Sequence, residues 1–540
     1  MGVLIHDGRR LDLAAGKTIF DYADDLLVRV PASCSKSGEC HECIVEIKRG
    51  MEALNGLTPP EAFLRGNYRL ACQARVEDAE ADVEFALLRR QPRILTHSVH
   101  RQIEPDPPVS RRDGEVCLEG EAIDRYRGRI LGLAIDLGTT TVAINLVDLE
   151  AGKVIHTASF ENPQRFGGSD VMHRISYDSG PCRGELQKVM LSAINFEIGA
   201  MVRLLGFRRQ EIYAVVAVGN ATMRDLFFGL DVAPIGEKPY RSVTETDLLA
   251  GRRESTALHA GAKELGLRVH ARATVYGGPL IGCHVGSDVA AGLLAVGMDE
   301  AEEPALFVDM GTNTEIVVGW RGRMLAASCP AGPAFEGGEI AYGMAGVEGA
   351  VESVRLDGGE VRCETIGGGE AQGICGSGLV DLLAELRRTG SMTELGVLND
   401  GAFEFVFAKE RGMSLSRADI SALAQAKAAN IAGQHILLRR YGLSPEQIPR
   451  LHLAGGFANY LNVANALSIG FLANLPAERV AKAGNAALEG ATILLLSRSM
   501  RRRIESLAVT IEHVELETIP DFFDIFVEGC LFKPMDNEFA

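Results

Sequence analysis

Residues 133–144 read LAIDLGTTTVAI, in which two apolar runs flank Asp136, Gly138, Thr139 and Thr140. Apolar runs joined by a short polar stretch that contains glycine predict a β-hairpin with a tight turn. Gly138 can adopt backbone angles that are closed to other residues. The turn would offer N–H groups and hydroxyls to an anion, with Asp136 at the strand end, where a hydrated Mg²⁺ can be held. Alone, this pattern is also typical of an ordinary structural turn.

A second copy of the pattern strengthens the phosphate-binding interpretation. Residues 306–318 read LFVDMGTNTEIVV, again with apolar runs on either side of the polar turn. The residues that align with the first loop are Asp309, Gly311, Thr312 and Asn313. Two related loops in one chain predict two related lobes that face one phosphate chain.

A third element follows at residues 451–459, LHLAGGFAN, where an apolar strand ends at Gly455 and Gly456. Backbone without side chains can lie flat against a nucleotide base. The order of hairpin loop, hairpin loop and strand–Gly–Gly resembles the ATPase superfamily of actin, sugar kinases and heat-shock chaperones (ASKHA). The resemblance implies a two-lobed, actin-like fold with ribonuclease H-like lobes, lobe I over residues 129–300 and lobe II over 301–540 with a C-terminal closing segment.

Composition limits the class of protein and its partners. A chain of 540 residues is too long for one core, so about three or four domains are expected. The formal net charge of −17 argues against nucleic acid or an anionic membrane as a partner. No run of 18 apolar residues and no signal-peptide-like N-terminus occurs in the sequence. The 11 cysteines are scattered rather than framed for disulfides, which favours a reducing cytoplasm.

A cysteine motif marks residues 1–90 as a small separate domain. Cys34, Cys40 and Cys43 have the spacing C-x5-C-x2-C on a loop of small residues, and Cys72 follows in the stretch RLACQA. Three cysteines on one loop and a fourth brought back by the fold suit a [2Fe–2S] cluster, which such a loop must wrap closely. The pattern resembles [2Fe–2S] ferredoxins, although its first gap is one residue longer than in the plant type, and this resemblance implies a β-grasp fold.

A structural zinc site is the main alternative for these cysteines. Such sites usually combine two paired knuckles, whereas only Cys40 and Cys43 make a C-x2-C pair here. His41 lies between two ligating cysteines and is expected to point outward rather than bind the metal. Residues 91–128 follow, and their prolines and charges predict a linker that lets the small domain move.

Two further polar residues are candidates for the ATPase site, each with a structural alternative. Asn220 follows the apolar strand 212–218, where α/β folds place ligands, and it could position a water molecule or simply cap the next helix. Glu336 lies in the stretch GPAFEGG, where it could activate water or bind the metal, or could be a solvated loop residue.

The stretches DLGTTT, DMGTNTE, GPAFEGG, ICGSGLVDLL and AGGFANYLN, together with the cysteine motif, resemble the reductive activators of corrinoid proteins over nearly the whole chain. The resemblance implies that ATP drives one electron from a [2Fe–2S] cluster to reduce Co(II) to Co(I) in a methyltransferase system. It assigns the cluster to the four cysteines, phosphate and Mg²⁺ to the two threonine loops, and adenosine to Gly455 and Gly456.

The partners implied are a corrinoid protein and a low-potential electron donor, and a homodimer is compatible with the resemblance. Two other functions stay open: a redox-sensing ATPase, and a ferredoxin-fused phosphotransferase without corrinoid reduction. Activators of radical dehydratases share the ATPase fold but hold a cluster between two subunits, whereas this chain carries four cysteines of its own.

Overall fold

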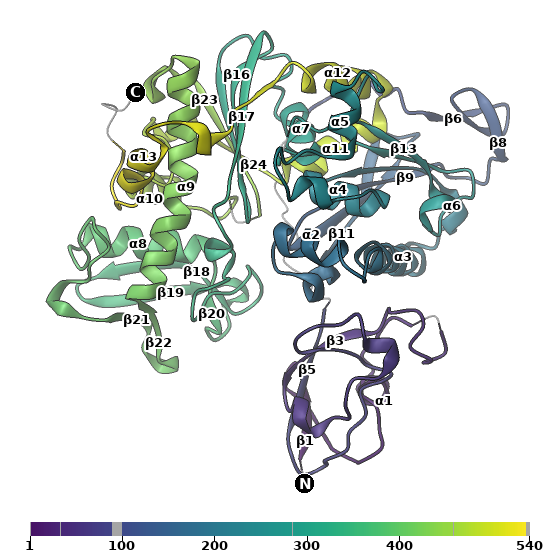
Figure 1. Ribbon diagram of the computed structural model, residues 1–540, viewed down its shortest axis with the longest axis horizontal. Helices are drawn as coiled ribbons and strands as arrows, with labels where there is room; N and C mark the ends of the chain where they lie inside the picture. The colour runs from purple at the N-terminus through teal and green to yellow at the C-terminus, as the bar shows by residue number, and fades with distance from the viewer. Residues whose placement is uncertain (1, 33, 89–99, 283, 457, 536–540) are drawn as a thin grey trace.

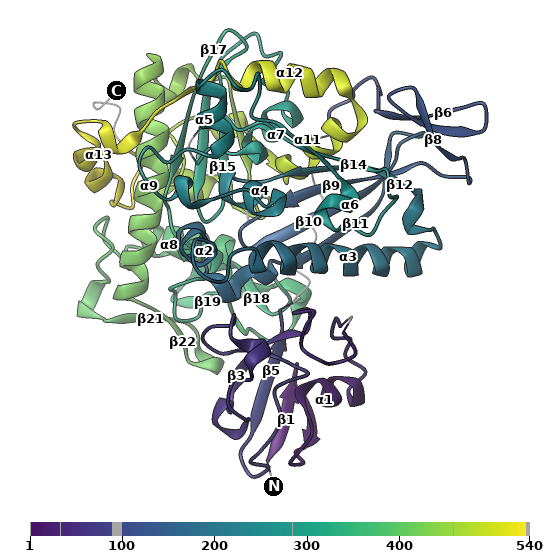
Figure 2. The ribbon, with the colours of Figure 1, turned by 45° about the vertical axis from the view of Figure 1, so that its right-hand side comes forward.

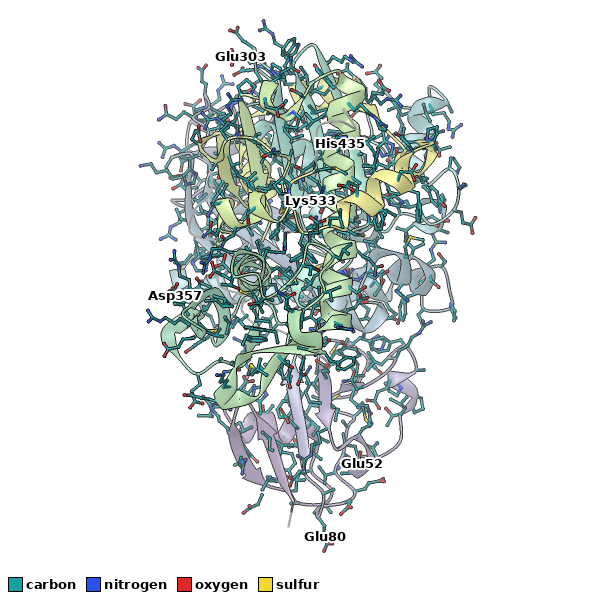
Figure 3. All side chains as sticks on the ribbon, turned by 90° about the vertical axis from the view of Figure 1, so that its left-hand side faces the viewer. Glu52, Glu80, Glu303, Asp357, His435 and Lys533 are labelled. Carbon is teal, nitrogen blue, oxygen red and sulfur yellow. The ribbon has the colours of Figure 1, made fainter. Side chains whose placement is uncertain are left out.

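The protein has a small N-terminal domain that lies beneath one of two α/β lobes, and the lobes lie side by side (Figure 1). In Figure 3, Glu52 and Glu80 mark the far end of the small domain, and Glu303 lies at the opposite end of the molecule. This arrangement agrees with the predicted ferredoxin-like domain and two-lobed ATPase. The computed structural model describes residues 2–32, 34–88, 100–282, 284–456 and 458–535.

The N-terminal domain is a five-stranded mixed sheet crossed by one helix, which is the predicted β-grasp arrangement. The strand order is β2-β1-β5-β3-β4, with β1 parallel to β5. Helix α1 begins after Thr18, whose hydroxyl accepts a hydrogen bond from the N–H of Asp21. The elements are β1 (Val3–His6), β2 (Arg9–Asp12), α1 (Ile19–Asp25), β3 (Ile44–Arg49), β4 (Tyr68–Leu70) and β5 (Val83–Leu87).

The segment with the features of a linker is structured in its second half. Three short antiparallel strands form a separate sheet: β6 (Val109–Arg112), β7 (Glu115–Leu118) and β8 (Glu121–Arg125). Gly114 and Gly120 have φ of +81° and +90° at the two turns, a conformation that favours glycine. Val109 and Val116 are buried in the core of lobe I. This part of the segment therefore differs from the extended linker that its prolines and charges predict.

Lobe I is a six-stranded sheet with helices on both faces. Its order is β11-β10-β9-β12-β14-β13, and all residues of the central strand β12 are buried. The strands are β9 (Leu131–Leu137), β10 (Thr141–Asp148), β11 (Lys153–Glu161), β12 (Ile212–Val218), β13 (Leu258–Gly261) and β14 (Thr274–Gly277). The helices are α2 (Val171–Asp178), α3 (Glu185–Leu205), α4 (Ala221–Phe228), α5 (Val243–Leu249), α6 (Ala262–Leu265) and α7 (Ser287–Ala295).

Lobe II repeats the plan of lobe I in five of its six strands, with three antiparallel strands continued by two parallel ones, and its sixth strand is added at the opposite edge. Its sheet has the order β24-β23-β15-β16-β17-β25. The strands are β15 (Ala305–Met310), β16 (Thr314–Trp320), β17 (Arg323–Cys329), β23 (Arg450–Ala454), β24 (Val480–Gly484) and β25 (Glu512–His513). The two predicted hairpins are thus β9–β10 and β15–β16, in equivalent places of the two sheets.

An insertion and several helices complete lobe II. Helix α9 (Arg417–Tyr441) starts with a capping box between Ser416 and Asp419. Within the described ranges, no helix is long and apolar enough to cross a bilayer. The other elements are β18 (Ala350–Asp357), β19 (Glu360–Thr365), β20 (Gly373–Ile374), α8 (Gly376–Arg388), β21 (Glu404–Ala408), β22 (Met413–Ser416), α10 (Val463–Ser468) and α13 (Phe522–Gly529).

Helix α11 (Ala486–Leu496) follows strand β24 of lobe II in the chain but packs on lobe I. It lies on α7 and on the sheet of lobe I, and α12 (Arg498–Ala508) packs beside it. These two helices therefore pack with lobe I, although they lie within residues 301–540, the range that the sequence analysis expects to form lobe II. The backbones of α7 and α11 touch, because a Cβ at Gly490 would lie 2.0 Å from the carbonyl oxygen of Ala291.

We predict that Gly490→Ala lowers the thermal unfolding midpoint of the protein. An alanine normally stabilises a helix interior by up to about 1 kcal/mol over glycine. Here the methyl group meets backbone of α7, which cannot rotate away, so a net loss of about 1–3 kcal/mol is expected. Gly199→Ala in α3 is the matched control, because its new methyl group meets the movable ends of the Arg209 and Arg203 side chains rather than the backbone of another helix. Equal midpoints for the two variants would contradict the close contact.

Candidate nucleotide cleft and cluster centre

The two hairpin turns face each other across a cavity of about 1160 Å³ between the lobes. Every residue that the sequence predicts for the nucleotide site lines this cavity. They are Asp136, Gly138, Thr139, Thr140, Asn220, Asp309, Gly311, Thr312, Asn313, Glu336, Gly455 and Gly456. Residues more than 300 positions apart in the chain thus meet in one cleft, whereas the individual role of each residue stays a prediction.

The first loop is held from behind by two fully buried side chains. The Asn162 amide donates to the carbonyl of Gly138 at 2.8 Å, and the Arg174 guanidinium donates to the carbonyl of Thr139 at 2.8 Å. Glycine is required at 138 because a Cβ there would lie 2.3 Å from the carbonyl oxygen of Thr141. The reason is a close approach and not the unusual backbone angles that the sequence suggests, since its φ is not positive.

Glu336 connects the two loops across the cleft. It lies at the end of the short 3₁₀ helix η6 (Ala334–Glu336) and accepts hydrogen bonds from Thr140 Oγ1 at 3.1 Å and Thr312 Oγ1 at 2.5 Å. Burial raises the pKa of its carboxyl above the ordinary value, although both threonines oppose the shift. Glu336 is therefore not a freely solvated loop residue, and its proposed part in activating water stays a prediction.

Asn220 caps the next helix, as one of its two predicted roles requires, and it also contacts the first loop, whereas its positioning of a water molecule stays a prediction. Its side-chain oxygen caps α4 by accepting the N–H of Met223 at 2.9 Å. Its amide nitrogen donates to Thr139 Oγ1 at 3.1 Å, so the cap of α4 also touches the first loop. The structural and functional alternatives for Asn220 are thus compatible with each other.

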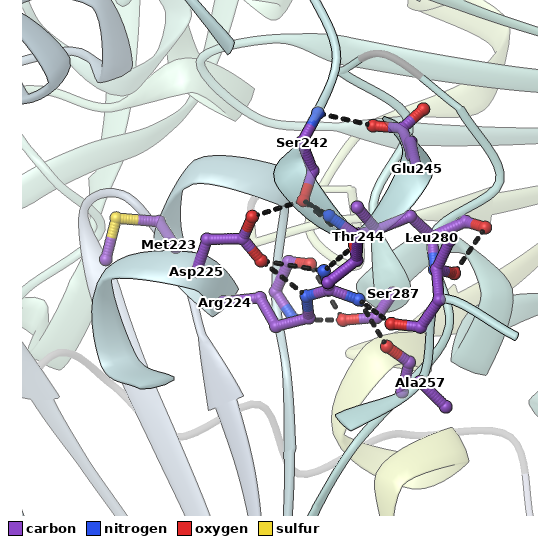
Figure 4. A network of polar contacts seen from close by, with 12 residues as sticks. Met223, Arg224, Asp225, Ser242, Thr244, Glu245, Ala257, Leu280 and Ser287 are labelled. Atoms are coloured by element: carbon purple, nitrogen blue, oxygen red, sulfur yellow. Dashed lines mark hydrogen bonds and ion pairs between the residues drawn. The ribbon is translucent and has the colours of Figure 1, made fainter. Parts of the chain in front are cut away.

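A buried ionic network fixes α4 from the opposite side (Figure 4). Arg224 donates to Asp225 at 2.7 Å and to Thr244 at 2.9 Å, and Ser242 donates to Asp225 at 2.5 Å. All four side chains are essentially excluded from solvent. Since removing one member would leave a buried charge without its partner, this network holds α4 and its Asn220 cap rigidly at the cleft.

Four of the carboxylates that line the cleft repel one another, and the sequence analysis missed two of these four. Asp288 at the start of α7 and Glu315 in β16 join Asp136 and Asp309. Burial together with repulsion from Asp288 and Asp136 raises the pKa of Asp309 to about 8. For Asp136, burial, partly offset by the hydrogen bond from Asn485, raises the pKa to about 7, and burial raises that of Asp288 to about 6.

This cluster calls for a cation, because neighbouring carboxylates cannot all ionise cheaply. Among the described residues, no group of three or more His, Cys, Asp or Glu is arranged as a ready-made metal site. Mg²⁺ usually keeps several waters and binds through one or two carboxylates plus substrate phosphates. The residues therefore fit a hydrated Mg²⁺ that arrives with a nucleotide.

Asn485 is a third cleft residue that sequence reasoning did not assign. It caps α11 and donates to Asp136 Oδ2 at 2.8 Å. A signal was present, because Gly484-Asn485-Ala486 repeats the Gly219-Asn220-Ala221 sequence at the start of α4. Asp288 had a weaker signal, a Gly-Ser-Asp stretch opening a helix.

The strand–Gly–Gly element lies where the resemblance to ASKHA proteins implies. Gly455 has φ of +110°, and a Cβ there would lie 2.1 Å from the carbonyl oxygen of Met310 in the second loop. A Cβ at Gly456 would meet nothing within 4 Å. Gly455 is thus needed for packing, whereas Gly456 leaves open space on the cleft side.

The four predicted cluster cysteines come together in two pairs. Cys43 Sγ lies 3.4 Å from Cys72 Sγ, and Cys34 is hydrogen-bonded to Cys40. Although burial opposes it, hydrogen bonds from Ser37 and Cys40 lower the pKa of Cys34 to about 6. A hydrogen bond from Cys43 lowers the pKa of Cys72 to about 7. Two thiol pairs with ionisable members fit the two irons of a [2Fe–2S] cluster.

The loop between these cysteines turns sharply through several residues with positive φ. Ser35, Lys36 and His41 all have positive φ, and Gly38 has φ of +89° and packs against Pro60 and Gln73. His41 points away from the thiols, as expected, but toward lobe I rather than into solvent, with 15 % of its side chain exposed.

Comparison with known proteins agrees with this geometry. Residues 4–77 match the 2Fe-2S iron-sulfur cluster binding domain, residues 131–301 the RACo middle region, and residues 303–540 the C-terminal domain of RACo, the ASKHA domain. The chain is 30% identical over 429 residues to the corrinoid activation enzyme RamQ of Eubacterium limosum, which covers 75% of this chain and 70% of RamQ. The chain belongs to the family of reductive activators of corrinoid proteins.

Other relatives support this membership. A [Co(II) methylated amine-specific corrinoid protein] reductase of Methanosarcina barkeri is 22% identical over 425 residues, 73% of this chain and 76% of that protein. The solved structure of a reductive activator for a corrinoid, iron–sulfur protein is 28% identical, covers 99% of this chain and 98% of its own, and superposes with a TM-score of 0.72.

Membership in this reductive activator family confirms the cofactors that the motifs predict. The N-terminal domain is a [2Fe–2S] domain rather than a zinc domain, and the two lobes form an ASKHA ATPase that uses ATP with Mg²⁺. The ferredoxin-like and actin-like fold assignments are confirmed as well.

We predict that Cys72→Ser abolishes stable cluster binding. Replacing one of the paired thiols leaves an iron without its thiolate ligand, so the purified protein should lose most of its iron and its visible charge-transfer absorption. Cys117→Ser is the matched control, since Cys117 is also a buried free thiol but lies in β7. Full iron content in the Cys72 variant would show that another group completes the site.

We also predict that Mg²⁺·nucleotide binding releases protons near pH 7. The raised pKa values of Asp136 and Asp309, about 7 and 8, leave both carboxyls partly protonated in the free protein at this pH. A divalent cation favours the ionised form and lowers both values, so protons leave. Calorimetry in buffers of different ionisation enthalpy measures the number released.

The release should disappear above about pH 9, where the carboxyls of the free protein are already ionised. Asp309→Asn should release fewer protons than the unchanged protein, which separates the protein's contribution from that of the nucleotide phosphates. Equal release by both would disprove the assignment of the protons to this cluster.

Proposed function

We propose that this protein uses ATP to reduce the Co(II) centre of a corrinoid protein to Co(I), within a methyltransferase system. The supporting observations are that one chain combines a four-cysteine ferredoxin domain with a two-loop nucleotide cleft, and that its relatives are named as a corrinoid activation enzyme and a corrinoid protein reductase. When bound, the [2Fe–2S] cluster supplies one low-potential electron.

Energetics explain why a nucleotide is needed. Plant-type clusters have potentials near roughly −400 mV, and the Co(II)/Co(I) couple of a resting corrinoid is harder to reduce. Each ~59 mV of uphill transfer of one electron lowers the equilibrium constant tenfold. Nucleotide can help only by favouring one conformation of the activator and its partner over another. Thr140, Glu336 and Thr312 already connect the lobes, so they are placed to sense the γ-phosphate.

The remaining partners follow from the same proposal. A low-potential electron donor must return an electron to the protein after each transfer. All cysteines in the described part of the chain are free thiols, which suits the reducing cytoplasm expected from the sequence. A homodimer stays a prediction, as does the exclusion of nucleic acid and membrane partners.

Anaerobic absorption spectroscopy of a corrinoid protein held in the Co(II) state tests the proposal. We expect Co(I) to form with this protein, a low-potential reductant and ATP together, and not when ATP is omitted. Asp136→Asn should lower the rate by about tenfold or more, because it removes a carboxylate of the Mg²⁺ cluster. Glu150→Gln, an exposed carboxylate of the same lobe, is the matched control.

Two outcomes would replace the proposal. ATP turnover without Co(I), with two different corrinoid proteins, would favour the redox-sensing ATPase. Transfer of the γ-phosphate to a small molecule would favour the phosphotransferase.

A further inference from the structure

The ferredoxin domain is docked on lobe I through a continuous apolar contact, beneath α3 and α2 (Figure 2). The Tyr177 hydroxyl in α2 donates to the backbone carbonyl of Phe63 at 2.5 Å. The Phe63 ring meets the edge of Phe166 at 5.6 Å, and Phe166 meets Tyr177 in the same way. One buried cluster therefore includes side chains from both domains, Cys43 and Cys72 among them.

The cluster loop itself lies in this contact. The His41 ring stacks on Phe63 with centroids 4.0 Å apart, and His41 Nδ1 lies 2.6 Å from the carboxylate of Glu185, the first residue of α3. Lys188 donates to the carbonyl of Glu39 at 3.3 Å. Side chains of α3 thus cover part of the loop that carries the half-buried Cys40, and opening of the contact would widen a partner's access to this part of the loop.

The segment of lobe I that carries Phe166 and Tyr177 also contacts the first phosphate loop, at its other end. Asn162 and Arg174 donate to the carbonyls of Gly138 and Thr139, as described above. Arg174 also donates to the carbonyl of Gly168 at 3.0 Å, which ties the start of α2 to the loop. Its guanidinium is fully buried, so its position must follow that of the carbonyls it binds.

We propose that α2 and the short 3₁₀ helix η3 (Pro163–Gly167) couple the nucleotide cleft to the docking of the ferredoxin domain. Arg174 and Tyr177 lie about one helical turn apart, so a movement of the Thr139 carbonyl that shifts Arg174 also shifts Tyr177. Nucleotide bound at the first loop thereby loosens the Tyr177–Phe63 contact and widens access to the loop that carries Cys40. Arg174 and Tyr177 are positioning residues in this scheme, which rests on the proposed function.

Thermodynamic linkage makes the coupling reciprocal. If nucleotide weakens docking by a given factor, then loss of docking must strengthen nucleotide binding by the same factor. Coupling between sites is commonly about fivefold or more. If nucleotide weakens docking, a variant with weaker docking must therefore bind nucleotide more tightly. A purely structural role for Tyr177 would not link these two effects.

Hydrogen exchange of the full, cluster-loaded chain, followed by mass spectrometry, tests this coupling. In the unchanged protein, a non-hydrolysable ATP analogue with Mg²⁺ should speed exchange of residues 58–70 about fivefold or more. Tyr177→Phe removes the hydroxyl but keeps the ring. In this variant, residues 58–70 should exchange fast even without nucleotide. The variant should also bind the analogue more tightly than the unchanged protein does, by about the same factor.

Two further variants keep the test decisive. Tyr276→Phe is the matched control, because Tyr276 is a buried tyrosine of lobe I that donates to Glu505 at 2.8 Å instead of to the ferredoxin domain. It should behave as the unchanged protein in both measurements. Arg174→Lys keeps the charge but loses the planar fork. It should keep slow exchange without nucleotide and lose the acceleration by nucleotide.

The proposal would be overturned if nucleotide did not change the hydrogen-exchange rate of residues 58–70. It would also be overturned if Tyr177→Phe bound nucleotide more weakly than the unchanged protein. The experiment contains no corrinoid protein. Failure to form Co(I) would therefore remove the proposed function and leave this measurement unaffected, whereas failure of the coupling would leave Co(I) formation to be explained by another route.

Discussion

The crossing of α7 and α11 is the constraint on which the rest of the structure depends. Their backbones touch at Ala291 and Gly490. The two faces of α7 serve different lobes, since Ala290 and Leu294 pack in the core of lobe I while Val289 and Leu293 pack with strands of lobe II. Because both helices start at cleft residues, this one contact sets how the two phosphate loops face each other.

The cleft holds electrostatic strain that the fold tolerates for its function. Asp136, Asp288 and Asp309 repel one another in a partly closed space, and burial raises the pKa of each. A cation and a phosphate chain together relieve this repulsion, so affinity for the nucleotide and affinity for its metal are joined in one site. Glu336 is hydrogen-bonded to both phosphate loops, so the joint dependence on nucleotide and metal extends to both lobes.

The sequence revealed the parts of the site that depend on local chemistry. Paired Asp-x-Gly-Thr loops and the cysteine spacing predict their own geometry, because each needs only a few neighbouring residues. The approach of Asp288 to the other cleft carboxylates and the return of α11 to lobe I depend on packing between distant segments, which no local pattern encodes. The sheet β6–β8 escaped notice because its strands are short and contain as many charged residues as apolar ones. Docking of the ferredoxin domain rests on Phe63 and Tyr177, ordinary core residues in sequence.

The late position of α11 in the chain has a consequence for biosynthesis. Lobe I acquires its last strand at residue 277 and α7 by residue 295, yet the helix that covers this face ends at residue 496. At the usual rates of synthesis, roughly 10–40 s pass between these points. During that interval the apolar face under α11 stays exposed on the ribosome, while lobe II is still being made. Lobe I of this protein should therefore mature only after most of lobe II has been made, and we expect the nascent chain to be a client for chaperones.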